Sequence, residues 1–143
     1  MSHTYKASLH DLTPLLEEFV ARIPGVTAAL LATPDGLRQA KAGMDTDDAD
    51  GMAALIAGLQ SLARAQFRAS AGSVRQVVIE HDAGSLYLMR ADATDPAAAG
   101  ALLAVRTEPG ADPQVVGFEM SRWIAGIDAH LQSALRATAA SSQ

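Results

Sequence analysis

Hydrophobic and polar positions follow two different periods along this chain, and the period changes at Pro and Gly. Apolar residues recur every three to four positions from residue 9 to residue 23, which predicts a helix with one buried stripe. Pro24-Gly25 ends it. A second helical pattern covers about residues 46–69 and a third about residues 113–136, where Val116, Met120, Trp123 and Ile127 share one face.

Short apolar runs between these helices predict strands. Residues 26–42 are typical of a hairpin turned at Thr33-Pro34-Asp35-Gly36. Residues 73–81 and 85–91 predict a second hairpin around Asp82-Ala83-Gly84, and residues 101–107 a fifth strand. The predicted order is α-β-β-α-β-β-β-α, in one domain over residues 1–136, with a disordered tail at 137–143.

The fold class that this order favours is α+β, with a five-stranded antiparallel sheet. We expect the terminal helices on one face and the central helix alone on the other. One helix covers about 10 Å of width, whereas five strands span about 20 Å. We therefore expect a second copy of the chain to supply the missing helix in a twofold dimer.

The central helix carries the most unusual pattern, since residues 51–63 hold no charge. Its larger side chains predict an arc that packs on the sheet: Met52, Leu55, Ile56, Leu59, Leu62, Ala63 and Phe67. The opposite arc is made of Ala, Gly and Ser. Because that arc offers little to water, we predict that it is covered by a second protein surface. The predicted interface comprises Ala54, Ala57, Gly58, Ser61, Arg64, Ala65, Arg68, Val74 and Gln76.

Composition narrows the function further. The net charge of −5 argues against a nucleic-acid partner. With no Cys, thiolate zinc sites and cysteine nucleophiles are excluded, and a reducing cytoplasmic setting fits. The chain begins without a hydrophobic signal core, and its apolar runs are too short for membrane insertion.

Motifs for chemistry are weak. The acidic run at 45–51 fails as a calcium loop in both registers, because Ile56 or Ala57 stands where a bidentate Glu is required. Carboxylates at a helix N-terminus explain it better. The histidines His3, His10, His81 and His130 have no ligand spacing. We therefore expect no catalytic residues, no metal, no cofactor and no enzymatic activity.

Five arginines and one tryptophan leave alternatives open. Arg64, Arg68, Arg75, Arg90 and Arg106 favour surface solvation or ion pairs, with an arginine finger as the sharper alternative. Trp123 fits either the core or an interface.

These segments together resemble a bacterial roadblock/dynein-light-chain domain over about residues 10–132. The resemblance is carried by five segments: Phe19-Val20-Ala21-Arg22-Ile23-Pro24-Gly25-Val26, Leu30-Leu31-Ala32-Thr33-Pro34-Asp35-Gly36-Leu37, residues 47–63 of the central helix, Gly72-Ser73-Val74-Arg75-Gln76 and Val116-Gly117-Phe118-Glu119-Met120.

The resemblance implies a cytoplasmic homodimer with paired central helices and a sheet continued through the third strand. It also implies a small Ras-like GTPase as partner, since some bacterial relatives are GTPase-activating proteins that remodel the GTPase. The predicted function is thus a homodimeric regulatory scaffold for such a GTPase. The alternatives are a heterodimer with a related subunit and a small-molecule sensor of the PAS or GAF type. The sensor would need polar groups in its core, for which Gln76, Tyr87 and Trp123 are the candidates.

Overall fold

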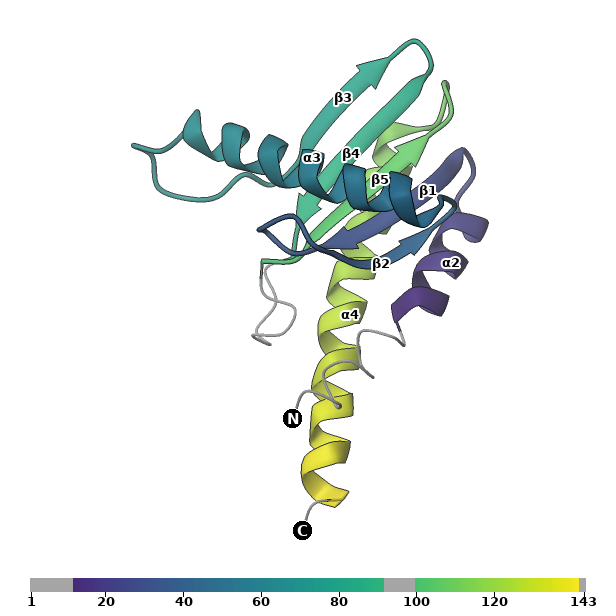
Figure 1. Ribbon diagram of the computed structural model, residues 1–143, viewed down its shortest axis with the longest axis vertical. Helices are drawn as coiled ribbons and strands as arrows, with labels where there is room; N and C mark the ends of the chain where they lie inside the picture. Colours follow the sequence, from purple (N-terminus) through teal and green to yellow (C-terminus); the bar gives the residue numbers. More distant parts are fainter. Residues whose placement is uncertain (1–11, 92–99, 142–143) are drawn as a thin grey trace.

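A computed structural model describes residues 12–91 and 100–141 of the chain (Figure 1). Three helices and five strands follow in the predicted α-β-β-α-β-β-β-α order. They are α2 (Leu12–Arg22), β1 (Val26–Ala32), β2 (Arg38–Ala42), α3 (Thr46–Ala65), β3 (Val77–His81), β4 (Gly84–Arg90), β5 (Leu102–Thr107) and α4 (Pro113–Ser141).

The five strands form one antiparallel sheet in the order β2-β1-β5-β4-β3. Strand β5 lies in the middle, where Ala104 faces Leu30 of β1 and Leu88 of β4. Its residues 102–105 are apolar and buried on both faces, and helices therefore cover the sheet from both sides. Strands β2 and β3 form the two edges.

Helices α2 and α4 cover one face of the sheet (Figure 1), as predicted for the terminal helices. Phe19, Tyr87 and Met120 are fully buried there. Trp123 packs against this core, with its ring edge-on to Phe19 at a centroid distance of 6.1 Å. Its indole Nε1 donates a hydrogen bond to the Leu15 carbonyl at 3.4 Å. The core alternative for Trp123 is therefore the one that the structure supports.

Among the residues that the structure describes, helix α3 alone crosses the other face (Figure 1). Its buried residues are Ala49, Met52, Ala53, Ile56 and Gln60, which follow the spacing of one helical stripe. They pack against Leu30, Leu88 and Leu102 of the strands. Because these strand residues are large, small alanines on the helix let its backbone approach the sheet closely.

The predicted sheet-facing arc of α3 is wrong in part. Met52 and Ile56 are buried, but Leu55, Leu62 and Phe67 are 70%, 67% and 66% exposed. A segment without charge on any side gives no polar face that would fix its rotation about its axis. The fit of alanines to large strand residues fixes it instead, and the leucines turn outward.

Element ends also differ from the predictions. Helix α3 ends at Ala65 rather than 69, because the N–H groups of Gln66 and Phe67 bond three residues back, to Ala63 and Arg64. Strand β3 starts at Val77 rather than 73. Helix α4 continues through Ser141, past the predicted end at residue 136. The alanine-rich sequence there has high helix propensity. Among the described residues, no helix combines the length and apolarity needed to cross a bilayer.

Candidate interaction surface

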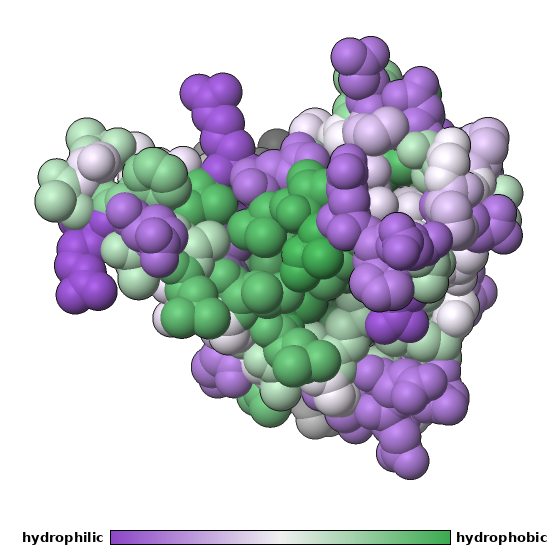
Figure 2. Space-filling model, turned by 90° about the horizontal axis from the view of Figure 1, so that it is seen from above, coloured by the Kyte–Doolittle hydropathy of each residue, from purple (hydrophilic) through white to green (hydrophobic). Residues whose placement is uncertain are grey.

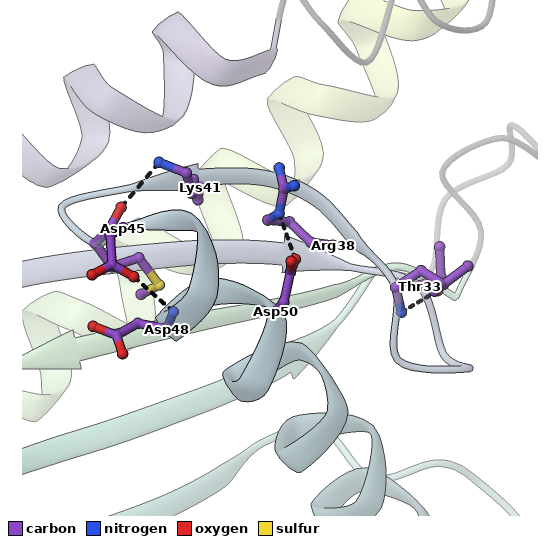
Figure 3. Close-up of polar contacts among 8 residues, drawn as sticks. Thr33, Arg38, Lys41, Asp45, Asp48 and Asp50 are labelled. Carbon is purple, nitrogen blue, oxygen red and sulfur yellow. Dashed lines mark hydrogen bonds and ion pairs between the residues drawn. The ribbon is translucent and has the colours of Figure 1, made fainter.

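The N-terminal part of α3 is held firmly on the sheet by polar contacts (Figure 3). The Asp45 carboxylate accepts a hydrogen bond from the Asp48 N–H at 2.8 Å and thereby caps the helix. Arg38 of β2 donates to Asp50 at 2.7 Å, and Lys41 donates to the Met44 carbonyl at 3.0 Å. The acidic run therefore serves as the helix N-terminus that the sequence predicted.

Further along α3, apolar side chains lie open to solvent. We call Leu55 and Leu62 of α3, together with Ile79 of β3, the apolar flank, and all three are exposed. Leu59, Val77 and Leu86 are partly buried and join this flank to the core beneath α3. Figure 2 shows a contiguous hydrophobic area on this side, bordered by hydrophilic residues. Such an area on a small protein is typical of an interaction site.

The first three predicted interface residues lie along the middle of α3. Ala54 and Gly58 are exposed, and the space around a side chain added at Gly58 is empty. Ala57 is half-buried beside the turn at Gly36. Gly36 itself has φ +92°, a left-handed conformation that glycine adopts readily. Ala57 thus supports the hairpin as well as any outer surface.

The other six predicted interface residues come together around one open cleft of about 860 Å³, which we call the basic cleft. It lies between the C-terminal half of α3, the segment 66–76 and the end of β4. The predicted residues that line it are Ser61, Arg64, Ala65, Arg68, Val74 and Gln76. Four of the five arginines considered from the sequence, Arg64, Arg68, Arg75 and Arg90, line this cleft. The fifth, Arg106, directs Nη2 toward the Met52 sulfur at 3.5 Å.

Four further lining residues, Gln60, Phe67, Arg75 and Arg90, are absent from the predicted interface, although Arg75 and Arg90 are among the five arginines considered from the sequence. A signal for Gln60 was present, because it continues the stripe of Met52 and Ile56 as a polar residue on the buried side. Arg90 carried no comparable signal, since only the folded sheet brings the end of β4 next to α3.

Histidine and the proposed sensor residues lie elsewhere. His81 accepts a hydrogen bond from the Ala83 N–H at 2.9 Å in the β3–β4 turn. His3 and His10 lie outside the described residues. Tyr87 and Trp123 pack in the core under α2 and α4, and Gln76 is an exposed residue of the cleft.

Comparisons with known proteins give one family. The family described as Roadblock/LC7 domain matches residues 12–107. A Roadblock/LC7 domain from Streptomyces avermitilis is 37% identical, covers 85% of this chain and 98% of its own, and has a TM-score of 0.75. A comparison with curated proteins gives no match.

More distant solved structures share the fold. The gliding protein MglB from Thermus thermophilus is 20% identical, with a TM-score of 0.71 over 89% of this chain and 93% of its own. Myxococcus xanthus MglB is 14% identical, with the same TM-score over 88% and 91%.

Proposed function

Because the chain belongs to the Roadblock/LC7 family, we propose that it is a homodimeric regulatory scaffold that binds a small Ras-like GTPase in the cytoplasm. The observation that carries the dimer is the apolar flank of α3 next to the outer edge of β3. The family is regulatory rather than catalytic, so we assign no catalytic residue.

A second copy of the chain is the partner that suits both features at once. In the sheet, β3 pairs with β4 on one side only, so its other edge presents backbone donors and acceptors. An antiparallel β3–β3 pairing about a twofold axis would satisfy that edge. The same axis would set two α3 helices side by side, and the flank leucines of each copy would cover those of the other.

The outward face of α3 would then form a two-helix platform for the GTPase. Ala54, Gly58, Ser61 and Ala65 stay exposed, and their small side chains allow a partner to approach the backbone closely. The link to a small Ras-like GTPase comes from the family resemblance. The heterodimer alternative would use the same flank and edge, with a related subunit in place of the second copy.

The dimer can be tested with two leucines of similar exposure. Leu62→Glu places a charge in the proposed interface, and we expect the dimer dissociation constant to rise by about 100-fold or more. Leu37, 63% exposed in the β1–β2 turn, is the matched control, and Leu37→Glu should leave the dimer intact. Sedimentation velocity over a range of protein concentrations measures both. A wild-type monomer, or equal dimerisation of both variants, would contradict the proposed interface.

The GTPase is tested separately, with the small GTPase encoded nearest to this chain. We expect calorimetry to show binding by the wild-type dimer in at least one nucleotide state, and weaker binding by Gly58→Arg. Titrations with the GDP form and with a form carrying a non-hydrolysable GTP analogue cover both states. If an intact dimer binds neither form, the GTPase half of the proposal is wrong and the dimer half remains.

A further inference from the structure

We propose that the basic cleft binds a phosphorylated small molecule of about nucleotide size. The cleft is built by a single protomer, so this site depends neither on the dimer nor on the GTPase. Its members come from three places in the fold: Gln60 and Arg64 from α3, Arg68 and Arg75 from the segment 66–76, and Arg90 from the end of β4.

Two buried donors in the cleft have no acceptor among the described residues. Gln60 is only 6% exposed, and its side-chain Nε2 is buried without a hydrogen-bond partner. The Nε of Arg90 is likewise buried and unpartnered. Buried polar groups are almost always paired, because a donor removed from water without an acceptor is costly. Two such donors lining one cleft call for an acceptor supplied from outside.

The charges of the cleft give the chemistry of that acceptor. The lining residues that the structure describes include four arginines and no Asp or Glu. The ion pairs found in the described part of the chain use Arg22, Arg38 and Arg122 instead. Guanidinium groups donate in a planar fork that matches phosphate oxygens. Because the whole chain carries a net charge of −5, this concentration of positive charge is local rather than a general property of the surface.

Size and shape favour a ligand larger than inorganic phosphate. The cleft volume of about 860 Å³ lies in the range of small-molecule sites. The ring of Phe67 lines the cleft and is 66% exposed, which leaves an aromatic face on which a base could stack. A di- or triphosphate held by the arginines, with a ring against Phe67, would use both features.

Another acidic group could occupy the cleft in place of a small molecule. The first turn of α3 holds Asp47 and Asp48, and antiparallel pairing of two α3 helices would bring that turn of one copy toward the arginines of the other. The two occupants predict different behaviour. A small-molecule site loses ligand when an arginine is removed, whereas a dimer contact loses dimer.

The experiment titrates the full chain with pyrophosphate, ATP, GTP and inorganic phosphate by calorimetry, with citrate as a non-phosphate anion of comparable charge. We expect pyrophosphate or a nucleotide to bind with a dissociation constant of about 100 µM or lower, and citrate and inorganic phosphate to bind at least about tenfold more weakly. A nucleotide is compared directly with pyrophosphate: if it binds more tightly, and this difference in affinity is lost in Phe67→Ala, the site recognises the base as well as the phosphates.

Matched variants localise the site. Arg68→Gln and Arg90→Gln should each weaken binding by about tenfold or more, while Arg122→Gln, which removes the same charge from α4, should not. Gln60→Leu should weaken binding and raise the melting temperature of the ligand-free protein, since it removes a buried donor without a partner. If Gln60 had only a structural role, its substitution would not weaken binding while raising the melting temperature.

Three results would overturn the proposal: no binding of any phosphate compound at millimolar concentration, citrate binding as tightly as pyrophosphate, or equal loss in Arg68→Gln and Arg122→Gln. Weaker dimerisation of Arg68→Gln without any phosphate binding would instead assign the cleft to the acidic turn of a second copy. These results are independent of the GTPase titration, because they are measured without it.

Discussion

The two halves of α3 are both rich in alanine and share the uncharged run at residues 51–63, yet they have different surroundings. In the N-terminal half, which we take as residues 46–56, Ala49, Met52, Ala53 and Ile56 are buried on the sheet, and Asp45 and Asp50 hold the helix by a cap and an ion pair. In the C-terminal half, Gln60 is the one buried residue among those that the structure describes, and Leu62 is exposed to solvent. The N-terminal half packs in the core of the fold, whereas the C-terminal half presents an exposed surface.

The difference shows that an apolar helical pattern indicates contact with another surface. The pattern does not show whether that surface belongs to the same chain or to a partner. The N-terminal half obtains its contacts within the chain. The C-terminal half reaches toward the β3 edge and beyond, where the sheet provides less to pack against (Figure 1). Its leucine and arginine side chains are therefore available for contacts from outside, and we place the dimer contact and the phosphorylated ligand there.

The difference in stability between the two halves should be largest when one aliphatic residue in each half is replaced. Ile56→Ala should lower the free energy of unfolding by about 3 kcal/mol, because it opens a cavity beneath α3. Leu62→Ala should cost less than about 0.5 kcal/mol in a monomeric background, since its side chain is exposed. Urea unfolding of both variants, made in an Ile79→Glu background that places a charge in the proposed dimer interface, measures the difference. Equal losses would mean that both halves of α3 pack on the sheet alike.

Most of the fold could be predicted from the sequence because its signals are local. The turn at Thr33–Gly36 is held by the hydrogen bond from Gly36 N to the Thr33 carbonyl at 3.0 Å, and the pattern of turn residues already indicated it. The pattern of β5, apolar on both faces, predicted helices on both sides of the sheet, and the structure has them there. The family resemblance drawn from five short segments is confirmed by the match over residues 12–107.

The candidate site was less predictable, because it depends on the rotation of α3 about its own axis and on contacts between residues that are far apart in the sequence. Which side of α3 meets the sheet is decided by how alanines fit against Leu30, Leu88 and Leu102. No pattern within α3 contains that information. Likewise, Arg64 and Arg90 are 26 positions apart in the sequence, and only the antiparallel sheet brings Arg90 to the end of the helix.

A smaller effect is expected from the cap that anchors the N-terminal half. Asp45→Ala should lower the free energy of unfolding by about 1 kcal/mol, because the Asp48 N–H loses its acceptor. Asp45→Asn keeps an acceptor oxygen and should be nearly neutral. Thermal unfolding followed by circular dichroism gives both values. An Asn variant as unstable as the Ala variant would show that charge near the helix N-terminus, rather than the hydrogen bond, provides the stabilisation.

The smallest expected effect belongs to the ion pair between β2 and α3. A double-mutant cycle with Arg38→Gln and Asp50→Asn should give a coupling energy of about 0.5 kcal/mol, since both side chains are partly exposed and the pair is screened by water. The coupling should fall further in 1 M NaCl, where the screening length is about 3 Å. A coupling that is large and independent of salt would mean that the pair is shielded from solvent in solution. Because Asp50 lies one helical turn before Ala54 of the proposed platform, such shielding would point to a dimer that also covers the start of α3. The contrast between the two halves of α3 would then hold for the isolated protomer alone.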